Sequence, residues 1–335
     1  MNSSGFRRAS KRRLGEALWP FAGRLTSRLF IRQQRGLILA FHYLGSPITE
    51  GVAEDLFLTH DEFTATLDFV RTNLCPLDPD TFLMLLKKGS LPPGATLLTF
   101  DDCAEKTVIE ALPELVSRNL KACFFANPGL VDAGRTVPAL ELMDLCRAAP
   151  AGAYKLRLPE SVSVEISDTA SRAAAYRLLW PKILACPSRE HAAVFKSIRD
   201  VFGAPDLSPD ARLASWALLE KLHTAGMLVG NHTMFHSTVN ADGIEQFTAD
   251  VDAAYEALEA RLGSSPRVFC YPYGRTVDAT PATTAGLDRM RTAYGFVTQG
   301  GIASAFKTGP LNLRREQASY SASAVKLAPL LATLR

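Results

Sequence analysis

The sequence predicts an α/β protein whose parallel strands close into a barrel. Two observations support this fold class. Short, continuous apolar runs, as expected for strands buried on both faces, alternate with segments that have helical spacing. In addition, polar clusters follow three of these runs directly, at 101–102, 232–236 and 271–274. The carboxyl ends of parallel strands in a closed barrel gather on one face, where catalytic residues lie.

The predicted elements follow one another along a body that spans residues 36–320. Strands are expected at 37–41, 95–100, 121–126, 228–230, 267–271 and 294–298, and helices at 61–74, 80–88, 107–119, 216–225, 247–262 and 284–292. The stretch from about 148 to 212 is rich in Ala, Arg and Pro and has mainly helical spacing at 170–185 and 188–202, which predicts a helical insertion over one rim. Residues 321–335 predict a C-terminal helix.

Residues 1–35 form a basic N-terminal tail. Residues 1–36 hold nine Lys or Arg and one acid, so this segment carries +8 and the rest of the chain −5. Apolar and basic residues recur within 14–33 at steps of three and four, which predicts an amphipathic helix. Such a helix docks on an anionic membrane surface or packs on the body with its arginines in solvent, and the second reading is somewhat favoured.

Targeting signals and cysteines indicate the compartment. We find neither an apolar run of membrane-spanning length nor an uninterrupted signal-peptide core. The six cysteines show no CxxC pair and lie mostly in apolar runs, as buried thiols of a reducing compartment do. We therefore expect a cytoplasmic protein, associated with the inner membrane surface if the tail docks there. The body is mildly acidic, and no nucleic-acid partner is expected.

The polar clusters at the strand ends suggest a metal site. Asp101-Asp102 alone fits a turn or a helix cap. His232 and His236, four residues apart, share one face of a helical or tightly turned segment and suit zinc, cobalt or nickel. Two histidines and one carboxylate leave coordination positions open, as in catalytic sites, so one aspartate would bind the metal while the other accepts a proton.

The third cluster offers substrate contacts. The N–H of Tyr273, just after Pro272, is a candidate donor to an oxyanion. Tyr271 and Tyr273 could pack against a sugar ring, and the reading of both as half-buried strand residues is about equally favoured.

These residues resemble the polysaccharide deacetylases of the NodB-homology family, carbohydrate esterase family 4. The family's first motif, TFDD followed by glycine, corresponds to Thr99–Asp102 with Cys103 in the glycine position. Its H-S/T-x-x-H motif is complete at His232–His236, and the segment Phe269–Gly274 resembles the branch with a YPYG-like third motif. The resemblance covers roughly residues 36–147 and 213–320.

The resemblance implies a distorted, often seven-stranded (β/α) barrel. It implies that Asp101 is the catalytic base and that Asp102, His232 and His236 bind a divalent metal, zinc first, with cobalt or nickel as alternatives. The family's last motif, L-x-H, supplies a general acid, but the corresponding segment 311–315 contains no histidine. His42, at the end of the first strand, is the expected substitute.

Arg314 or Arg315 could orient Asp101, and Arg315 is also expected, with Tyr271, Pro272 and Tyr273, among the substrate-binding residues. The predicted reaction is hydrolysis of an N-acetyl, less often O-acetyl, group on a carbohydrate. The cytoplasmic location suggests a soluble or lipid-linked N-acetylated sugar. Two alternatives remain at this stage: a catalytically degenerate carbohydrate-binding protein on the same fold, and a hydrolase of a non-sugar amide.

Overall fold

A computed structural model describes residues 35–158, 160–203, 207–264, 266–275, 278–301, 303 and 309–318. The helices expected at 14–33 and 321–335 lie outside these residues. No helix of the described part is long and apolar enough to cross a membrane.

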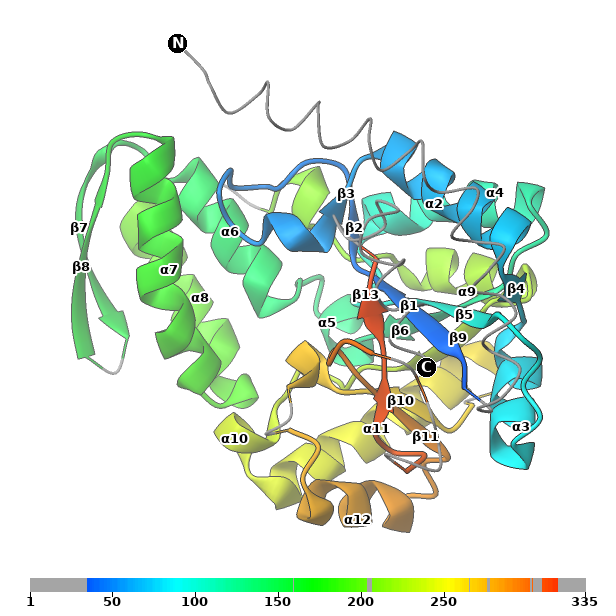
Figure 1. Cartoon of the computed structure of the whole chain (residues 1–335). Helices are drawn as coiled ribbons and strands as arrows, with labels where there is room; N and C mark the ends of the chain where they lie inside the picture. Colours follow the sequence, from blue (N-terminus) through cyan, green and yellow to red (C-terminus); the bar gives the residue numbers. More distant parts are fainter. Residues whose placement is uncertain are drawn as a thin grey trace.

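The described chain is organised around a nearly closed barrel of parallel strands, which confirms the predicted fold class (Figure 1). The strand order around the barrel is β12-β11-β10-β9-β6-β5-β1-β13. These strands are β1 (Leu37–Phe41), β5 (Ala95–Phe100), β6 (Ala122–Ala126), β9 (Leu228–Asn231), β10 (Val268–Cys270), β11 (Tyr294–Val297), β12 (Leu313–Arg314) and β13 (Glu316–Gln317). A short strand, β4 (Cys75–Pro76), pairs with β5, and β2 (Tyr43–Leu44) pairs with β3 (Phe57–Leu58).

One segment closes the barrel. Leu313-Arg314 pairs with β11, and Glu316-Gln317 pairs with β1. Only Arg315 separates these two strands. The path therefore counts eight strands, one more than the seven expected, because this closing segment divides its hydrogen bonds between the two edges. The division leaves Arg315 at the junction.

Helices cover the outside of the barrel. They are α2 (His60–Asn73), α3 (Pro79–Lys88), α4 (Glu105–Ser117), α9 (Trp216–Thr224), α11 (Ile244–Leu262) and α12 (Pro281–Arg289). Three more helices, α5 (Pro128–Asp132), α6 (Pro138–Ala148) and α10 (Val239–Asp242), lie towards the insertion (Figure 1), and α6 packs in its apolar core. Local signals fix several ends. Thr59 and Glu62 form a capping box at the start of α2. Asp78 caps α3, and Gly89 ends that helix with a left-handed backbone.

Alternation along the strands sets which side chains face the barrel interior. Leu37, Leu39 and Phe41 of β1 pack outward under the helices, whereas Ile38 joins an inner cluster. On β5, Leu98 and Phe100 pack outward, whereas Ala95 and Leu97 join the inner cluster and Thr99 Oγ1 accepts from the buried Arg315. By the same alternation, Asp101, which directly follows β5, points into the barrel.

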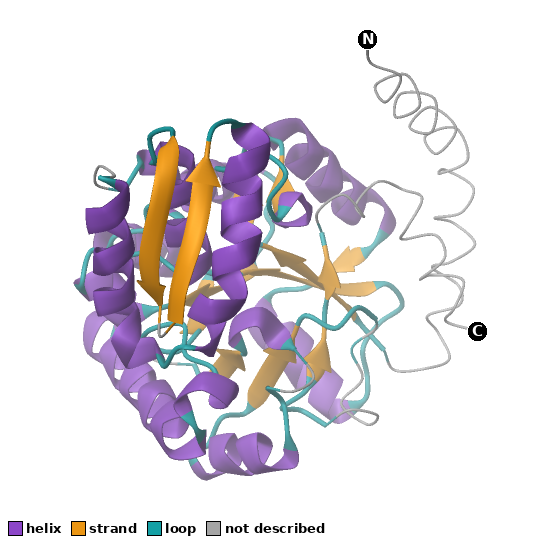
Figure 2. Ribbon diagram, turned by 90° about the vertical axis from the view of Figure 1, so that its left-hand side faces the viewer, coloured by secondary structure: helices purple, strands orange, loops and turns teal. Residues whose placement is uncertain are grey.

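The insertion expected at about 148–212 forms a lobe beside the barrel (Figure 1). It holds the helices α7 (Thr169–Ala185) and α8 (His191–Phe202), close to the predicted ranges. It also holds an antiparallel hairpin, β7 (Gly152–Leu158) and β8 (Glu160–Ile166), that the sequence reading did not predict (Figure 2). Buried apolar residues alternate with exposed ones in the second half of β7 and along β8, which is the period-two signal of a half-buried strand.

Candidate active site

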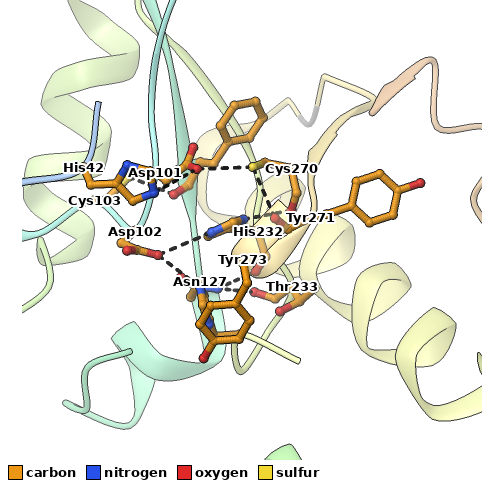
Figure 3. Close-up of polar contacts among 12 residues, drawn as sticks. His42, Asp101, Asp102, Cys103, Asn127, His232, Thr233, Cys270, Tyr271 and Tyr273 are labelled. Carbon is orange, nitrogen blue, oxygen red and sulfur yellow. Dashed lines mark hydrogen bonds and ion pairs between the residues drawn. The ribbon is translucent and has the colours of Figure 1, made fainter. Parts of the chain in front are cut away.

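The three polar clusters meet at the carboxyl ends of β5, β9 and β10 (Figure 3). Asp101 continues the inward parity of β5. Asp102 and Cys103 then adopt left-handed backbone conformations, with φ of 65° and 52°. This turn sends the two adjacent carboxylates in different directions, so that Asp101 faces Arg315 and Asp102 faces the two histidines.

Asp101 forms a buried ion pair with Arg315. The guanidinium donates to both carboxylate oxygens, with NH1–Oδ1 and NH2–Oδ2 distances of 2.6 Å each. Its other donors reach the Val297 carbonyl, Thr99 Oγ1 and Cys270 Sγ. Burial raises the pKa of the Asp101 carboxyl, but the charge and hydrogen bonds of Arg315 outweigh burial and hold this pKa at about 2. Asp101 is therefore an ionised carboxylate at neutral pH, as a base must be.

The position of Arg315 corrects one expectation. Its side chain is completely buried, and all five of its N–H donors are occupied inside the protein. It therefore has no donor left for a substrate. Of its two suggested roles, the structure supports orientation of Asp101 and not substrate binding.

His42 lies on the other side of Asp101. Its Nε2 is 3.5 Å from Asp101 Oδ2, and Gln317 Nε2 lies 3.1 Å from its Nδ1. The glutamine amide fixes the ring with Nε2 directed at the carboxylate. Burial lowers the pKa of His42 despite the raising effect of Asp101 and Asp102. The sequence did not single out Gln317, whose link to His42 spans 275 positions.

Asp102, His232 and His236 form a buried trio. Both imidazole Nε2 atoms face the same carboxylate oxygen, Oδ1 of Asp102, at 3.3 and 3.2 Å. Within the described part of the chain, Asp102 Oδ1 has no hydrogen-bond partner. Its other oxygen accepts from the Tyr43 hydroxyl, and His232 Nδ1 is 2.8 Å from the Cys270 carbonyl oxygen. The sequence reading gave no role to Tyr43, although it directly follows His42.

The trio fits a divalent cation. Two imidazole nitrogens and a carboxylate oxygen are zinc ligands, and bonds of about 2.0–2.2 Å at a tetrahedral angle would set the ligand atoms roughly 3.3–3.5 Å apart. The observed separations agree with that value. A cation would also satisfy the unpaired Oδ1. The support of His232 by a carbonyl and of Asp102 by a hydroxyl is the outer-shell pattern of metal sites.

A second trio, Asp101, His232 and Cys270, also brings its ligand atoms together. Arg315 donates to both Asp101 and Cys270, so its positive charge already occupies the place of a metal ion. Like charges would repel there. We therefore assign the cation site to Asp102, His232 and His236.

The loop that carries the histidines is held by buried polar groups. Asn127 Nδ2 donates to the carbonyl oxygens of His232 and Thr233, and Asp250 on α11 accepts from the Met234 N–H. Asp250 also bonds to the Ser237 hydroxyl. Burial raises the pKa of Asp250 to about 6 even though these donors lower it. Sequence reasoning missed Asp250, which appeared only as one polar residue of a periodic helix.

The third cluster divides its side chains between two environments. Tyr273 has a left-handed backbone with φ of 60°, and its ring lies 4.6 Å from that of His236. Tyr271 instead packs against Phe269, and its hydroxyl donates to the Leu311 carbonyl. The structure therefore brings Tyr273 to the site and turns the Tyr271 side chain away, as Figure 3 shows. Pro272 is buried between them.

Comparison with known proteins agrees with this geometry. The model of the polysaccharide deacetylase family matches residues 88–289, about three fifths of the chain. The chain belongs to the polysaccharide deacetylase family. It is accordingly a hydrolase that acts on carbon–nitrogen bonds other than peptide bonds. No curated protein matches the sequence significantly.

Several solved deacetylases share the fold. The deacetylase PplD of Streptococcus pyogenes, in complex with acetate, has a TM-score of 0.60 at 19% identity and covers 89% of this chain and 98% of its own. IcaB from Ammonifex degensii has a TM-score of 0.57 at 18% identity, with 89% and 97% covered. A polysaccharide deacetylase from Bacillus cereus has a TM-score of 0.56 at 12% identity, with 89% and 69% covered. At these identities the likeness concerns the fold.

The structure also accommodates the family departure at Cys103. The left-handed backbone there explains why glycine would suit this position. The Cys103 thiol donates to the Phe125 carbonyl oxygen at 3.3 Å, and the Cys103 carbonyl oxygen accepts from the Ala214 N–H. These two hydrogen bonds help to hold Cys103 in a backbone conformation that glycine adopts more readily.

Proposed function

We propose that this deacetylase removes N-acetyl groups, or less often O-acetyl groups, from a carbohydrate, with a divalent metal ion at Asp102, His232 and His236. Zinc is the proposed ion, and cobalt and nickel suit the same donors. The observation that carries the proposal is the unpaired, buried Oδ1 of Asp102 facing two imidazole nitrogens. The adjacent, ionised Asp101 supplies the base that hydrolysis needs.

The residues around the cation site account for the chemistry. A divalent ion held there would acidify a bound water and polarise the acetyl carbonyl. Asp101, fixed by Arg315, accepts the proton of the attacking water. The Tyr273 N–H, which has no acceptor among the described residues, donates to the oxyanion that develops on the carbonyl oxygen. The proton that Asp101 takes from the water then passes to the leaving nitrogen by way of His42, whose Nε2 lies 3.5 Å from Asp101 Oδ2. His42 thus takes the place of the histidine absent from segment 311–315, and Asp101 returns to its ionised form.

Acetate release tests the proposal. The wild-type protein should release acetate from N-acetylated sugars, and a chelator should stop the release until zinc is restored. Asp101→Asn should retain bound metal and lose turnover, because Asn cannot accept the proton. A variant with normal metal content and near-normal turnover would show that Asp101 is not the base. Turnover that survives complete metal removal would refute the metal assignment.

We further propose that the enzyme works in the cytoplasm, on a soluble or lipid-linked sugar, with residues 14–33 contacting the inner membrane surface. The amphipathic, basic pattern of these residues supports the idea. Deletion of residues 1–35 should abolish binding to vesicles that contain anionic lipid and leave acetate release from soluble sugars unchanged. Equal vesicle binding by the shortened chain would refute the membrane contact.

A further inference from the structure

A row of aromatic rings connects the cation site with the insertion. The Tyr273 ring contacts His236, and the Trp180 ring of α7 lies 5.5 Å from the Tyr273 ring at an interplanar angle of 70°. Tyr176, one helical turn earlier, stacks on Trp180 at 5.7 Å and 12°. These separations place the Trp180 ring within about 10 Å of the His236 ring. Such a span is longer than one pyranose unit and comparable to two.

The row is held in place from both ends. Tyr273 keeps a left-handed backbone, an arrangement that costs a bulky residue energy and that recurs at ligand-binding sites. The insertion is anchored beside the histidine loop, because Ser188 Oγ lies 2.9 Å from Ser237 Oγ, next to His236. Ser188 also donates to Asp242 through its N–H and its hydroxyl, at 2.8 Å each. The position of α7 relative to the site is thus fixed by polar bonds.

Two polar groups of the row remain available to a ligand. Buried Tyr and Trp usually bond their O–H and N–H groups. Among the described residues, neither the Trp180 indole N–H nor the Tyr273 hydroxyl has a hydrogen-bond partner, and neither is a fully enclosed atom. Trp180 is only partly buried, whereas Tyr176 behind it is 7% exposed. An aromatic surface with free donors suits the apolar face and hydroxyl rim of a sugar.

We infer that Trp180 is a specificity-determining residue that stacks on the sugar unit next to the one losing its acetyl group. The inference rests on the proposed carbohydrate deacetylation. The insertion would then select oligosaccharides over monosaccharides, since a single sugar at the cation site does not reach Trp180. The ligand class is an N-acetylated oligosaccharide of at least two units.

Substitutions that preserve packing test the inference. Trp180→Leu keeps apolar bulk and removes the aromatic face, and Trp180→Phe keeps a smaller face. The matched control is Leu178→Ala, on the same helix and 46% exposed. The assay compares kcat/KM for N-acetylglucosamine with that for its β-1,4- and β-1,6-linked trisaccharides. Binding of the trisaccharides is measured by calorimetry in the Asp101→Asn background, where turnover is absent.

The ratio of trisaccharide to monosaccharide kcat/KM should fall about tenfold in Trp180→Leu, because an aromatic contact is worth roughly a factor of ten in affinity. It should fall less in Trp180→Phe and stay unchanged in Leu178→Ala. An equal loss for both substrates would show that Trp180 only supports Tyr273, and an unchanged ratio would exclude a contact. Both results overturn the inference.

Calorimetry separates this inference from the proposed function. If no sugar releases acetate but trisaccharides bind and Trp180→Leu weakens that binding, the reaction is wrong and the subsite stands. Trisaccharide binding that is absent from the wild-type chain, or insensitive to Trp180→Leu, overturns the subsite whatever the turnover.

Discussion

The buried pair of Asp101 and Arg315 gives the most direct test of the site. Replacing Arg315 by Met keeps side-chain volume but removes the charge that faces Asp101. Both residues are almost inaccessible, at 2% and 0% exposure, and the pair is bidentate at 2.6 Å. Breaking a buried pair by removal of one partner costs about 3–5 kcal/mol, because the other charge stays buried without compensation. That is a large part of the roughly 5–15 kcal/mol that stabilises a folded domain.

Urea unfolding at pH 7 measures this cost. The free energy of unfolding should fall by about 3–5 kcal/mol in Arg315→Met. In the double variant Asp101→Asn/Arg315→Met both charges are gone, and most of the loss should be recovered while turnover stays absent. A single-variant cost below about 1 kcal/mol would mean that solvent screens the pair. Additive losses in the double variant would show that the two residues do not act as a pair.

The free energy of unfolding should depend on pH through the same pair, Asp101 and Arg315. The pKa of Asp101 is held at about 2, below the usual 3.8, so its stabilising contribution is present above pH 3.8 and lost as the pH falls towards 2. Without Arg315, burial becomes the dominant influence and raises the pKa of Asp101, with only His42 and His232 opposing it. Protonation of Asp101 should then stabilise the folded variant as the pH falls. The stability difference between wild type and Arg315→Met should therefore be largest near neutrality and narrow as the pH falls.

Three further predictions concern the surroundings of the site. Tyr43→Phe removes the donor to Asp102 and should weaken metal binding by about 10- to 100-fold, measured by competition with a chelator; unchanged affinity would mean the hydroxyl is dispensable. Gly274→Ala should lower the free energy of unfolding by more than the roughly 1 kcal/mol expected for Gly134→Ala, because both have positive φ but only Gly274 lacks room for a Cβ. The raised pKa of Asp250 means that its charged form is the less stable one in the fold. As the pH falls from 7 through 6 towards 4, the free energy of unfolding of the wild type should therefore rise by up to about 3 kcal/mol relative to Asp250→Asn. A difference between the two proteins that does not change with pH would contradict that pKa.

Local pattern was sufficient for most of the barrel. Continuous apolar runs at 37–41 and 95–100 became β1 and β5 within the predicted bounds, because a strand buried on both faces needs apolar residues at every position. The hairpin of residues 152–166 was missed although its alternation is visible in the sequence. The surrounding Ala- and Arg-rich helices favoured a helical reading of the whole insertion.

The chain by itself determined that Asp101, His232 and the segment 271–274 follow parallel strands, and therefore that they meet at one end of a barrel. This follows because parallel strands all end at the same edge of the sheet, and the position of each strand can be predicted from local sequence. Tertiary structure alone decided the partners. Arg315 reaches Asp101 across 214 positions because the closing segment divides its bonds between the two edges of the barrel. The left-handed turn at Asp102 separates two adjacent carboxylates, and the insertion brings Trp180 to Tyr273. Contacts of this kind depend on how distant segments pack, which the spacing of residues in a sequence does not encode.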